Sequence, residues 1–442
     1  MDGHTGFNVY LLYVIKSCII KKNNIIYCMR RITMNKQEAI NALKEHNQEH
    51  VIKRLEALDE VSAKKLIAQV ASIDWSVVES INHKAEDNSS DRKVEPLEAV
   101  EIKDIKANKD KYTAKGIEAI KAGKVAAVLL AGGQGTRLGL DKPKGTLNVG
   151  INKDLFLFEQ LINNLLDVVN QSGAYVPLYI MTSDKNNNDT VAFFEEHNFF
   201  GYDKDYVKFF IQSMAPSVDY NGKLYMESTD SLAMSPNGNG GWFTSLIDAG
   251  LDKDMESKGI ELVNVFAVDN ILQRIADPSF VGATILSGAD CGSKVVRKCA
   301  PDEKVGVMCK VNGHPSIIEY YEMSEELANM RREDGELTYG FGVILNYLFS
   351  FNKLVEIANR KLPLHIVEKK IPYIDENDNL VKPETPNGYK FEKLVLDMVE
   401  MMDNCVPYEV ERNYEFAPIK NKTGKDSLES ARELLKVNGI EF

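Results

Sequence analysis

Apolar residues follow two different patterns along this chain. Between residues 35 and 70 they recur at three- and four-residue spacing, which predicts amphipathic helices. From residue 125 onward, short continuous apolar runs appear instead, and such runs are typical of strands buried on both faces of a parallel sheet. We predict strands of this kind at residues 125–130, 176–181, 207–211 and 262–268.

Helical patterns separate several of these strands. Residues 156–169 and 190–197 have helical spacing, and a further helix is expected at 113–121, where Gly123 would end it. The polar, charge-rich residues 83–111 are expected to form a connecting segment with at most short helices. Alternation of strand and helix predicts an α/β fold with a doubly wound, mostly parallel sheet.

The pattern also suggests where the chain divides. Residues 1–34 are interpreted as an extension or a misplaced start, because the apolar segment Phe7–Ile20 is too short to span a membrane and is not preceded by basic residues. Targeting or membrane contact is the alternative. The remaining chain is expected to comprise an N-terminal helical region, a catalytic α/β domain and a small C-terminal domain, at residues 35–121, 122–382 and 383–442.

Composition narrows the class of protein. With 442 residues, 44% hydrophobic and 27% charged, the chain is not globally disordered, fibrous or a polytopic membrane protein. The net charge of −12 disfavours nucleic acid as a partner, because an acidic surface repels polyanions, and an anionic substrate would need a local basic pocket. The six cysteines form no CxxC pair, which favours a reducing, cytoplasmic setting.

A glycine-rich loop follows the first predicted strand. Residues 130–139 are LAGGQGTRLG, and Pro143, Lys144 and Gly145 come shortly after. Glycine backbones can approach phosphate oxygens closely, and Arg137 and Lys144 could neutralise a polyphosphate. The Lys-Gly-Thr order does not match an ATPase loop, and Leu138 breaks a dinucleotide fingerprint. A tight turn with surface charges is the remaining alternative.

This loop closely resembles that of the sugar-nucleotide pyrophosphorylases, and in particular that of the eukaryotic UDP-N-acetylglucosamine pyrophosphorylases. The resemblance runs from about Lys124 to the C-terminus. Further segments match in order and spacing, at residues 238–241, 268–270, 288–290, 319–320, 386–388 and 416–421.

The resemblance implies a nucleotidyltransferase fold and a uridylyltransferase. UTP and N-acetylglucosamine 1-phosphate would give UDP-N-acetylglucosamine and pyrophosphate by in-line attack on the α-phosphorus, with Mg²⁺ or Mn²⁺ as cofactor. It further implies a cytoplasmic monomer or weak homodimer without stable membrane insertion. The alternatives are the same reaction on glucose, galactose or N-acetylgalactosamine 1-phosphate, or a non-catalytic UDP-sugar-binding relative.

Site residues follow from the matching motifs. The positions that match catalytic residues are Arg137, Lys144 and Lys420. Those that match UTP-binding residues are Leu130, Ala131, Gly132, Gly133, Lys144, Gln212, Gly238, Asp269 and Lys390. Those that match sugar-binding residues are Asn239, Gly306, Glu319, Tyr320 and Lys420. Asp269 is also the expected metal ligand, because it ends a predicted buried strand and a carboxylate suits Mg²⁺.

Taken singly, several of these residues have ordinary alternatives. Gln212 could be an exposed residue at a strand end, residues 237–241 a turn, and Asp269 a helix cap. Lone lysines such as Lys390 and Lys420 are usually solvated. The assignments to these residues therefore depend on the resemblance.

Three positions depart from the family pattern near the sugar. Val343 stands where relatives have a sugar-contacting asparagine, and Leu394 and Leu396 replace two phenylalanines. We expect N-acetylglucosamine 1-phosphate to remain the best substrate, with relaxed selection against bulkier N-acyl sugars.

Overall fold

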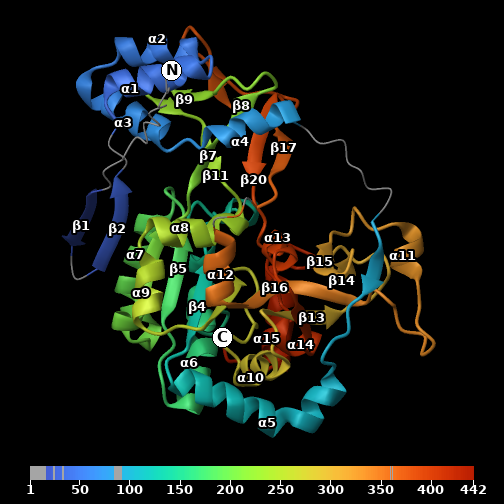
Figure 1. Ribbon diagram of the computed structural model, residues 1–442. Helices are drawn as coiled ribbons and strands as arrows, with labels where there is room; N and C mark the ends of the chain where they lie inside the picture. Colours follow the sequence, from blue (N-terminus) through green and yellow to red (C-terminus); the bar gives the residue numbers. More distant parts are fainter. Residues whose placement is uncertain (1–15, 23–24, 32–33, 84–91, 359, 361) are drawn as a thin grey trace, which may run out of the picture.

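The computed structural model describes residues 16–22, 25–31, 34–83, 92–358, 360 and 362–442. Figure 1 shows a large α/β body and a smaller lobe that contains the N-terminal helices. The body holds the predicted sheet, and the candidate site lies where the body meets the lobe.

The central sheet of the body is mixed. Four strands are parallel in the order β12-β4-β5-β6, and β16 adds antiparallel to β12. Beyond β16 the order continues through β14 and β15, while β13 pairs with β16 and β21, and β3 with β14. The strand bounds are β3 Val94–Pro96, β4 Val125–Leu130, β5 Leu178–Thr182, β6 Val207–Ile211, β12 Leu262–Ala267, β13 Cys291–Arg297, β14 Val307–Val311, β15 His314–Ile318, β16 Phe341–Ser350 and β21 Cys405–Glu409.

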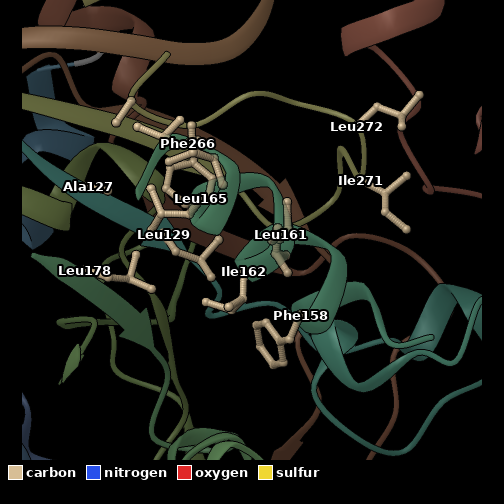
Figure 2. Close-up of a cluster of buried hydrophobic side chains, with 14 of the residues drawn as sticks. Ala127, Leu129, Phe158, Leu161, Ile162, Leu165, Leu178, Phe266, Ile271 and Leu272 are labelled. Atoms are coloured by element: carbon tan, nitrogen blue, oxygen red, sulfur yellow. The ribbon is translucent and has the colours of Figure 1, made fainter. Parts of the chain in front are cut away.

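Helices cover both faces of this sheet, so the doubly wound fold is confirmed. Alternate side chains of β4 point to opposite faces, with Ala127 and Leu129 in one core cluster and Ala126 and Val128 in the other. Figure 2 shows the first cluster, where α6 packs on the strands. The helices of that face are α5 Ile102–Lys121, α6 Leu157–Ser172, α7 Asn187–Glu196, α10 Pro278–Ser287 and α15 Leu428–Val437. Those of the other face are α8 Trp242–Asp248, α9 Leu251–Ser257, α12 Phe351–Ala358 and α13 Val395–Glu400.

One helix differs from its prediction. Helix α5 begins at Ile102, so the last ten residues of the segment expected to be a connection are helical. Only a narrow apolar stripe, with Ile105 and Tyr112 half-buried against the core, distinguishes these residues from a polar linker. The packing of α5 against α10 stabilises a helix that the charge-rich sequence obscures.

The smaller lobe combines three distant parts of the chain. Its helices are α1 Lys36–Glu45, α2 Glu49–Ala57, α3 Glu60–Ala71 and α4 Trp75–Glu79. Their apolar faces share a core with residues such as Ala215, Leu224 and Phe391. The short strands of the lobe are β7 Met214–Pro216, β8 Val218–Asp219, β9 Met226–Ser228, β10 Ser231–Leu232, β11 Met234–Pro236, β17 His365–Lys369, β18 Tyr373–Ile374, β19 Leu380–Val381 and β20 Gly388–Glu392.

Residues 383–442 contribute to both parts. Strand β20 pairs with β17 and β8 in the lobe, whereas β21 pairs in parallel with β13 in the central sheet. Helix α14 (Arg412–Glu415) and α15 follow, and α11 (Glu325–Asn329) lies beyond β15.

The start of the chain contains a hairpin. Strands β1 (Lys16–Lys22) and β2 (Ile25–Arg31) pair antiparallel, and β2 contacts β6. Most of the apolar segment Phe7–Ile20 lies outside the described residues. No helix within the described ranges has the length and apolar character that crossing a membrane would require.

Candidate active site

Two cavities adjoin at the carboxyl ends of β4 and β12. The larger, of about 940 Å³, is lined from the body by the glycine-rich loop and from the lobe by β17 and β20. The smaller, of about 350 Å³, lies beside β16 and α13. Four residues line both cavities, namely Asn239, Asp269, Leu345 and Lys420. A ligand in one cavity could therefore meet a ligand in the other beside these side chains.

The glycine-rich loop is held by a buried asparagine. The Asn186 side-chain amide donates to the carbonyl oxygens of Ala131 at 2.9 Å and Gly133 at 3.4 Å. Its oxygen accepts from the Ser183 backbone N–H at 2.7 Å. Sequence reasoning missed Asn186, because its only signal was an asparagine before a predicted helix, and such residues usually cap helices.

Gln212 and two glycines form the inner wall of the larger cavity. A Cβ atom on Gly132 would lie 2.8 Å from Gln212 Oε1, so a side chain there would displace the amide. Gln212 Nε2 donates to the Gly238 carbonyl at 2.6 Å. Gly238 has a φ of 86°, and a Cβ there would lie 2.2 Å from the Lys393 carbonyl oxygen. These contacts leave a flat amide with spare hydrogen-bonding capacity facing the cavity.

Three cations and one carboxylate gather near the junction. Lys420 Nζ lies 3.8 Å from Asp269 Oδ2. Burial lowers the pKa of Lys144; Asp269 opposes this shift, and Lys420 and Arg137 lower the pKa further. Lys144 lies in the 3₁₀ turn Lys144–Thr146, and Arg137 is exposed on the turn Thr136–Leu138. The resulting excess of positive charge suits a polyphosphate.

A short antiparallel contact sets the separation of Asp269 and Lys420. The Ile419 N–H donates to the Asp269 carbonyl at 2.9 Å. The Asn270 side chain donates to the Glu415 carbonyl at 2.7 Å and accepts from the Ala417 N–H at 2.9 Å. The segment that carries Lys420 is therefore bound along its length to the segment that carries Asp269.

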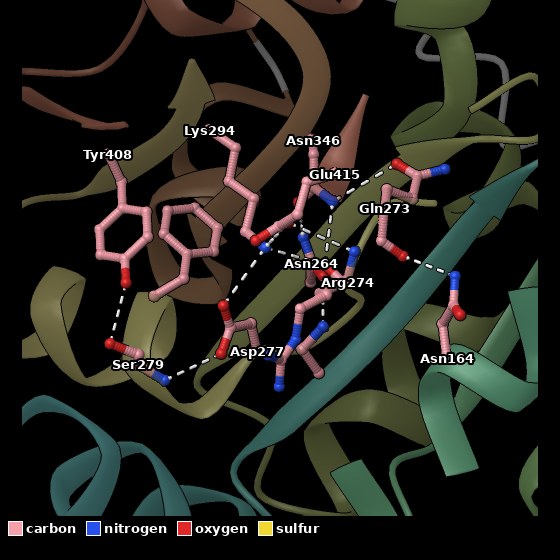
Figure 3. Close-up of polar contacts among 12 residues, drawn as sticks. Asn164, Asn264, Gln273, Arg274, Asp277, Ser279, Lys294, Asn346, Tyr408 and Glu415 are labelled. Atoms are coloured by element: carbon pink, nitrogen blue, oxygen red, sulfur yellow. Dashed lines mark hydrogen bonds and ion pairs between the residues drawn. The ribbon is translucent and has the colours of Figure 1, made fainter. Parts of the chain in front are cut away.

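Beneath this contact lies a buried ionic network (Figure 3). The fully buried Lys294 places its amine 2.5 Å from Glu415 Oε2 and 3.4 Å from Asp277 Oδ2, and donates to the Arg274 carbonyl at 3.1 Å. Burial alone would raise the pKa of Asp277, but Lys294 and Arg274 hold it below its ordinary value. Burial raises the pKa of Glu415 despite the same two cations. Lys294 thus anchors one end of the segment bearing Lys420.

The smaller cavity has polar and apolar walls. Gly306 lies close to Glu319 and Val343: a Cβ on it would be 3.3 Å from Glu319 Oε1 and 3.4 Å from Val343 Cγ2. Burial and the nearby Glu322 raise the pKa of Glu319, although Lys420 and His365 oppose this. A further polar contact fixes the start of α13, since Asn239 Oδ1 accepts from the Val395 N–H at 2.9 Å.

The structure brings the sequence-predicted residues together. All of them line one or both cavities except Ala131, which is buried beneath the loop. Val343, Leu394 and Leu396 line the smaller cavity, while Tyr320 is 44% exposed at its edge. Lys369 and Lys370 line the larger cavity, and sequence reasoning missed them because adjacent lysines are ordinarily solvated surface.

The surroundings of Asp269 fit one particular kind of metal site. Among the described residues, no group of three or more histidine, cysteine or acidic side chains could hold an ion alone. Mg²⁺ is commonly bound by one or two carboxylates together with substrate phosphates and water. The Asp269 carboxylate, beside a cavity lined by cations that suit phosphates, matches that donor set.

Comparisons with known proteins agree with this geometry. The family described as UTP–glucose-1-phosphate uridylyltransferase matches residues 74–439. A Homo sapiens relative named UDP-N-acetylhexosamine pyrophosphorylase-like protein 1 is 44% identical to this chain. The matched part covers 74% of this chain and 66% of the length of that protein. The Saccharomyces cerevisiae UDP-N-acetylglucosamine pyrophosphorylase is 36% identical over 88% of the chain and 84% of its own length.

A solved structure is similar over most of the chain. The uridine diphosphate N-acetylglucosamine pyrophosphorylase of Trypanosoma brucei superposes with a TM-score of 0.78 at 29% identity, covering 91% of this chain and 85% of that one. The glycine-rich loop, the two adjoining cavities and the family match all indicate an enzyme fold of the UDP-sugar pyrophosphorylases. The chain therefore belongs to the UDP-sugar pyrophosphorylase family, alongside the UDP-N-acetylglucosamine pyrophosphorylases.

Proposed function

We propose that this protein forms UDP-N-acetylglucosamine and pyrophosphate from UTP and N-acetylglucosamine 1-phosphate. The observation that carries the proposal is the meeting of two cavities at Asp269 and Lys420. The larger cavity offers glycine backbone and several cations to a nucleotide, and the smaller offers Glu319 and an apolar wall to a sugar. The names of the yeast and trypanosomal relatives support the same assignment.

The reaction requires positioning and charge neutralisation from the protein. A phosphate oxygen of the sugar phosphate attacks the α-phosphorus of UTP, and the bond from that phosphorus to the β-phosphate bridging oxygen breaks. Arg137 and Lys144 neutralise the triphosphate, and Lys420 at the junction can contact the phosphates of both substrates. Fixed cations of this kind stabilise the charge that develops in the transition state without reorganising.

Other residues orient the two substrates. The Gln212 amide can pair with a donor and an acceptor on the uracil edge. Glu319 can accept hydrogen bonds from sugar hydroxyls. A side chain at position 306 would meet Ile317 and Glu319, so the glycine there leaves the Glu319 carboxylate accessible to the sugar. Holding both reactants in line converts a bimolecular encounter into an oriented one.

We further propose that Asp269 binds Mg²⁺ or Mn²⁺ together with the phosphates. Such an ion would neutralise phosphate charge and restrict the orientation of the triphosphate. We also propose that the enzyme is cytoplasmic, that it acts as a monomer or weak homodimer, and that it does not bind nucleic acid.

A second candidate keeps the reaction and changes the sugar. Val343, Leu394 and Leu396 make the wall of the smaller cavity more apolar and less bulky than the family pattern. The human relative is named for N-acetylhexosamine rather than for N-acetylglucosamine alone. Both observations favour N-acetylgalactosamine 1-phosphate as an alternative substrate.

The decisive experiment measures pyrophosphate release by the purified full chain. It uses UTP, Mg²⁺ and a panel of 1-phosphates of N-acetylglucosamine, N-acetylgalactosamine, glucose and galactose. The highest kcat/KM should be obtained with N-acetylglucosamine 1-phosphate, and Lys144→Ala should serve as the inactive control. No release with any sugar from a folded preparation would refute the proposed enzyme, and a higher value for N-acetylgalactosamine would select the second candidate.

A further inference from the structure

The larger cavity is strongly positive although the whole protein is acidic. Six cations line it, against two carboxylates, Asp269 and Glu392. The chain as a whole has 53 lysines and arginines against 65 aspartates and glutamates. The proposed phosphate roles of Arg137, Lys144 and Lys420 account for three of the cations, and the match of Lys390 to a UTP-binding position accounts for a fourth. They leave Lys369 and Lys370 unexplained.

These two lysines come from the lobe and not from the central sheet of the body. Lys369 is the last residue of β17 and Lys370 follows it. Strand β17 pairs antiparallel with β20, with Val367 opposite Lys390 and Lys369 opposite Gly388. Directly opposed residues share a face of the sheet, so Lys369 and Lys390 are diagonal neighbours on one face.

The arrangement places like charges together. Burial lowers the pKa of Lys390, and the neighbouring Lys185 and Lys369 lower it further, although Glu392 and Glu227 oppose this shift. No acidic partner within ion-pair distance of Lys369, Lys370 or Lys390 occurs among the salt bridges of the described residues. Clustered cations repel one another, and a bound polyanion would relieve that repulsion.

The remaining contacts decide which part of the nucleotide this charge would face. Gln212 and Gly238 suit the base, and Asp269 with Lys420 marks the junction where the α-phosphate must meet the sugar phosphate. The β- and γ-phosphates carry most of the negative charge of UTP and leave as pyrophosphate. They are the part of the substrate that needs a second set of cations.

We propose that Lys369 and Lys370, together with Lys390, form a lobe-side subsite for the β- and γ-phosphates and hence for the departing pyrophosphate. This inference rests on the proposed function. The glycine-rich loop would hold these phosphates from the body and the lysines from the lobe. When the bond to the α-phosphorus breaks, the electron pair passes to the bridging oxygen of pyrophosphate, whose charge the lysines would stabilise.

The test uses the reverse reaction, in which pyrophosphate and UDP-N-acetylglucosamine are separate substrates. The double variant Lys369→Gln with Lys370→Gln should raise the KM for pyrophosphate at least about tenfold, as expected when charged contacts are lost. The KM for UDP-N-acetylglucosamine should change less than about twofold by the same reasoning. A charge-preserving Lys369→Arg with Lys370→Arg variant should largely restore the pyrophosphate KM.

The matched control removes the same charge elsewhere. Lys109 and Lys111 are exposed on α5 and line neither cavity, so Lys109→Gln with Lys111→Gln should leave both KM values unchanged. An unchanged pyrophosphate KM in the lobe variant, or a rise confined to the UDP-sugar, would overturn the subsite.

Direct binding separates this inference from the proposed function. Calorimetric titration with Mg²⁺-pyrophosphate measures the subsite without turnover, and the lobe variant should bind at least about tenfold more weakly than the wild type. A wild-type protein that binds pyrophosphate through these lysines but forms no product would refute the proposed function only. Equal binding by wild type and variant would refute the subsite only.

Discussion

Replacing Lys294 tests the buried network beneath the junction of the two cavities. Lys294→Met keeps a long, flexible side chain of similar volume and removes the charge. It leaves Glu415 and Asp277 buried with Arg274 as the remaining cation of the network. Because the Glu415 carbonyl accepts from Asn270, the substitution should disturb stability and the placement of Lys420 together.

The expected magnitude follows from the contacts that are lost. Lys294 is fully buried and lies within ion-pair distance of two carboxylates. Removing one partner of a buried ion pair costs about 3–5 kcal/mol, since it leaves an uncompensated charge. The double variant Lys294→Met with Glu415→Gln removes that charge, so it should be more stable than Lys294→Met alone by about 1–3 kcal/mol.

The loss of free energy of unfolding in Lys294→Met should also depend on pH. Burial already raises the pKa of Glu415, and loss of the neighbouring amine removes a cation that lowers it. A carboxyl group whose folded pKa exceeds its unfolded value binds more protons in the folded state, so stability falls as pH rises. Lys294→Met should therefore be closer to wild type at pH 5 than at pH 7.5, by up to about 1.4 kcal/mol per pH unit.

Urea titration monitored by tryptophan fluorescence and circular dichroism measures both effects. Lys64→Met is the control, because Lys64 and its partner Glu60 are 73% and 82% exposed, and no measurable change is expected. Turnover should fall in Lys294→Met even at temperatures where the variant is fully folded. Equal free energies of unfolding for Lys294→Met and wild type at pH 7.5 would refute the reasoning.

Further predictions concern the catalytic groups, the metal, the extension and the sugar. Lys144→Ala should lower kcat at least about a hundredfold while the melting temperature stays near wild type, and near-normal turnover would exclude its role. Activity should vanish with excess chelator, and Asp269→Asn should need more Mg²⁺ for half-maximal rate, so an unchanged Mg²⁺ requirement would contradict the ligand assignment. A chain that begins at Met34 should be soluble and fully active, and loss of folding would show that the hairpin stabilises the body. Val343→Asn with Leu396→Phe should sharpen selection against bulkier N-acyl analogues about ten- to hundredfold, whereas an unchanged kcat/KM ratio would show that these side chains do not set selectivity.

The sequence by itself determined the four parallel strands β4, β5, β6 and β12 of the central sheet, but not its antiparallel strands. The predicted strands at 125–130, 207–211 and 262–268 agree with β4, β6 and β12 to within one residue. Such strands are buried on both faces, so every position carries the same apolar signal, which does not depend on distant neighbours. The glycine-rich loop was equally clear, because glycines and cations at fixed spacing are a local signal.

Only the tertiary structure decided the roles of several polar residues. Asn186, Lys294 and Lys369 look alike in the sequence to solvated asparagines and lysines. One binds the loop backbone, one is fully buried with Glu415, and one faces a cavity. The type of a polar residue determines which hydrogen bonds and ion pairs its side chain can make. Its actual partners come from segments far along the chain, so the sequence near the residue does not reveal them.

The same reason explains why the lobe was not predicted as a unit, although its N-terminal helices were. Its core joins helices near the N-terminus to strands around residues 215–232 and 364–391, and each short strand has too few apolar residues to signal itself. The lobe brings Lys369, Lys370 and Lys390 to the nucleotide cavity. Local pattern therefore determined the parallel strands and the glycine-rich loop that follows β4. Long-range packing decided which charges surround the substrate, because burial and charge proximity are properties of the folded chain.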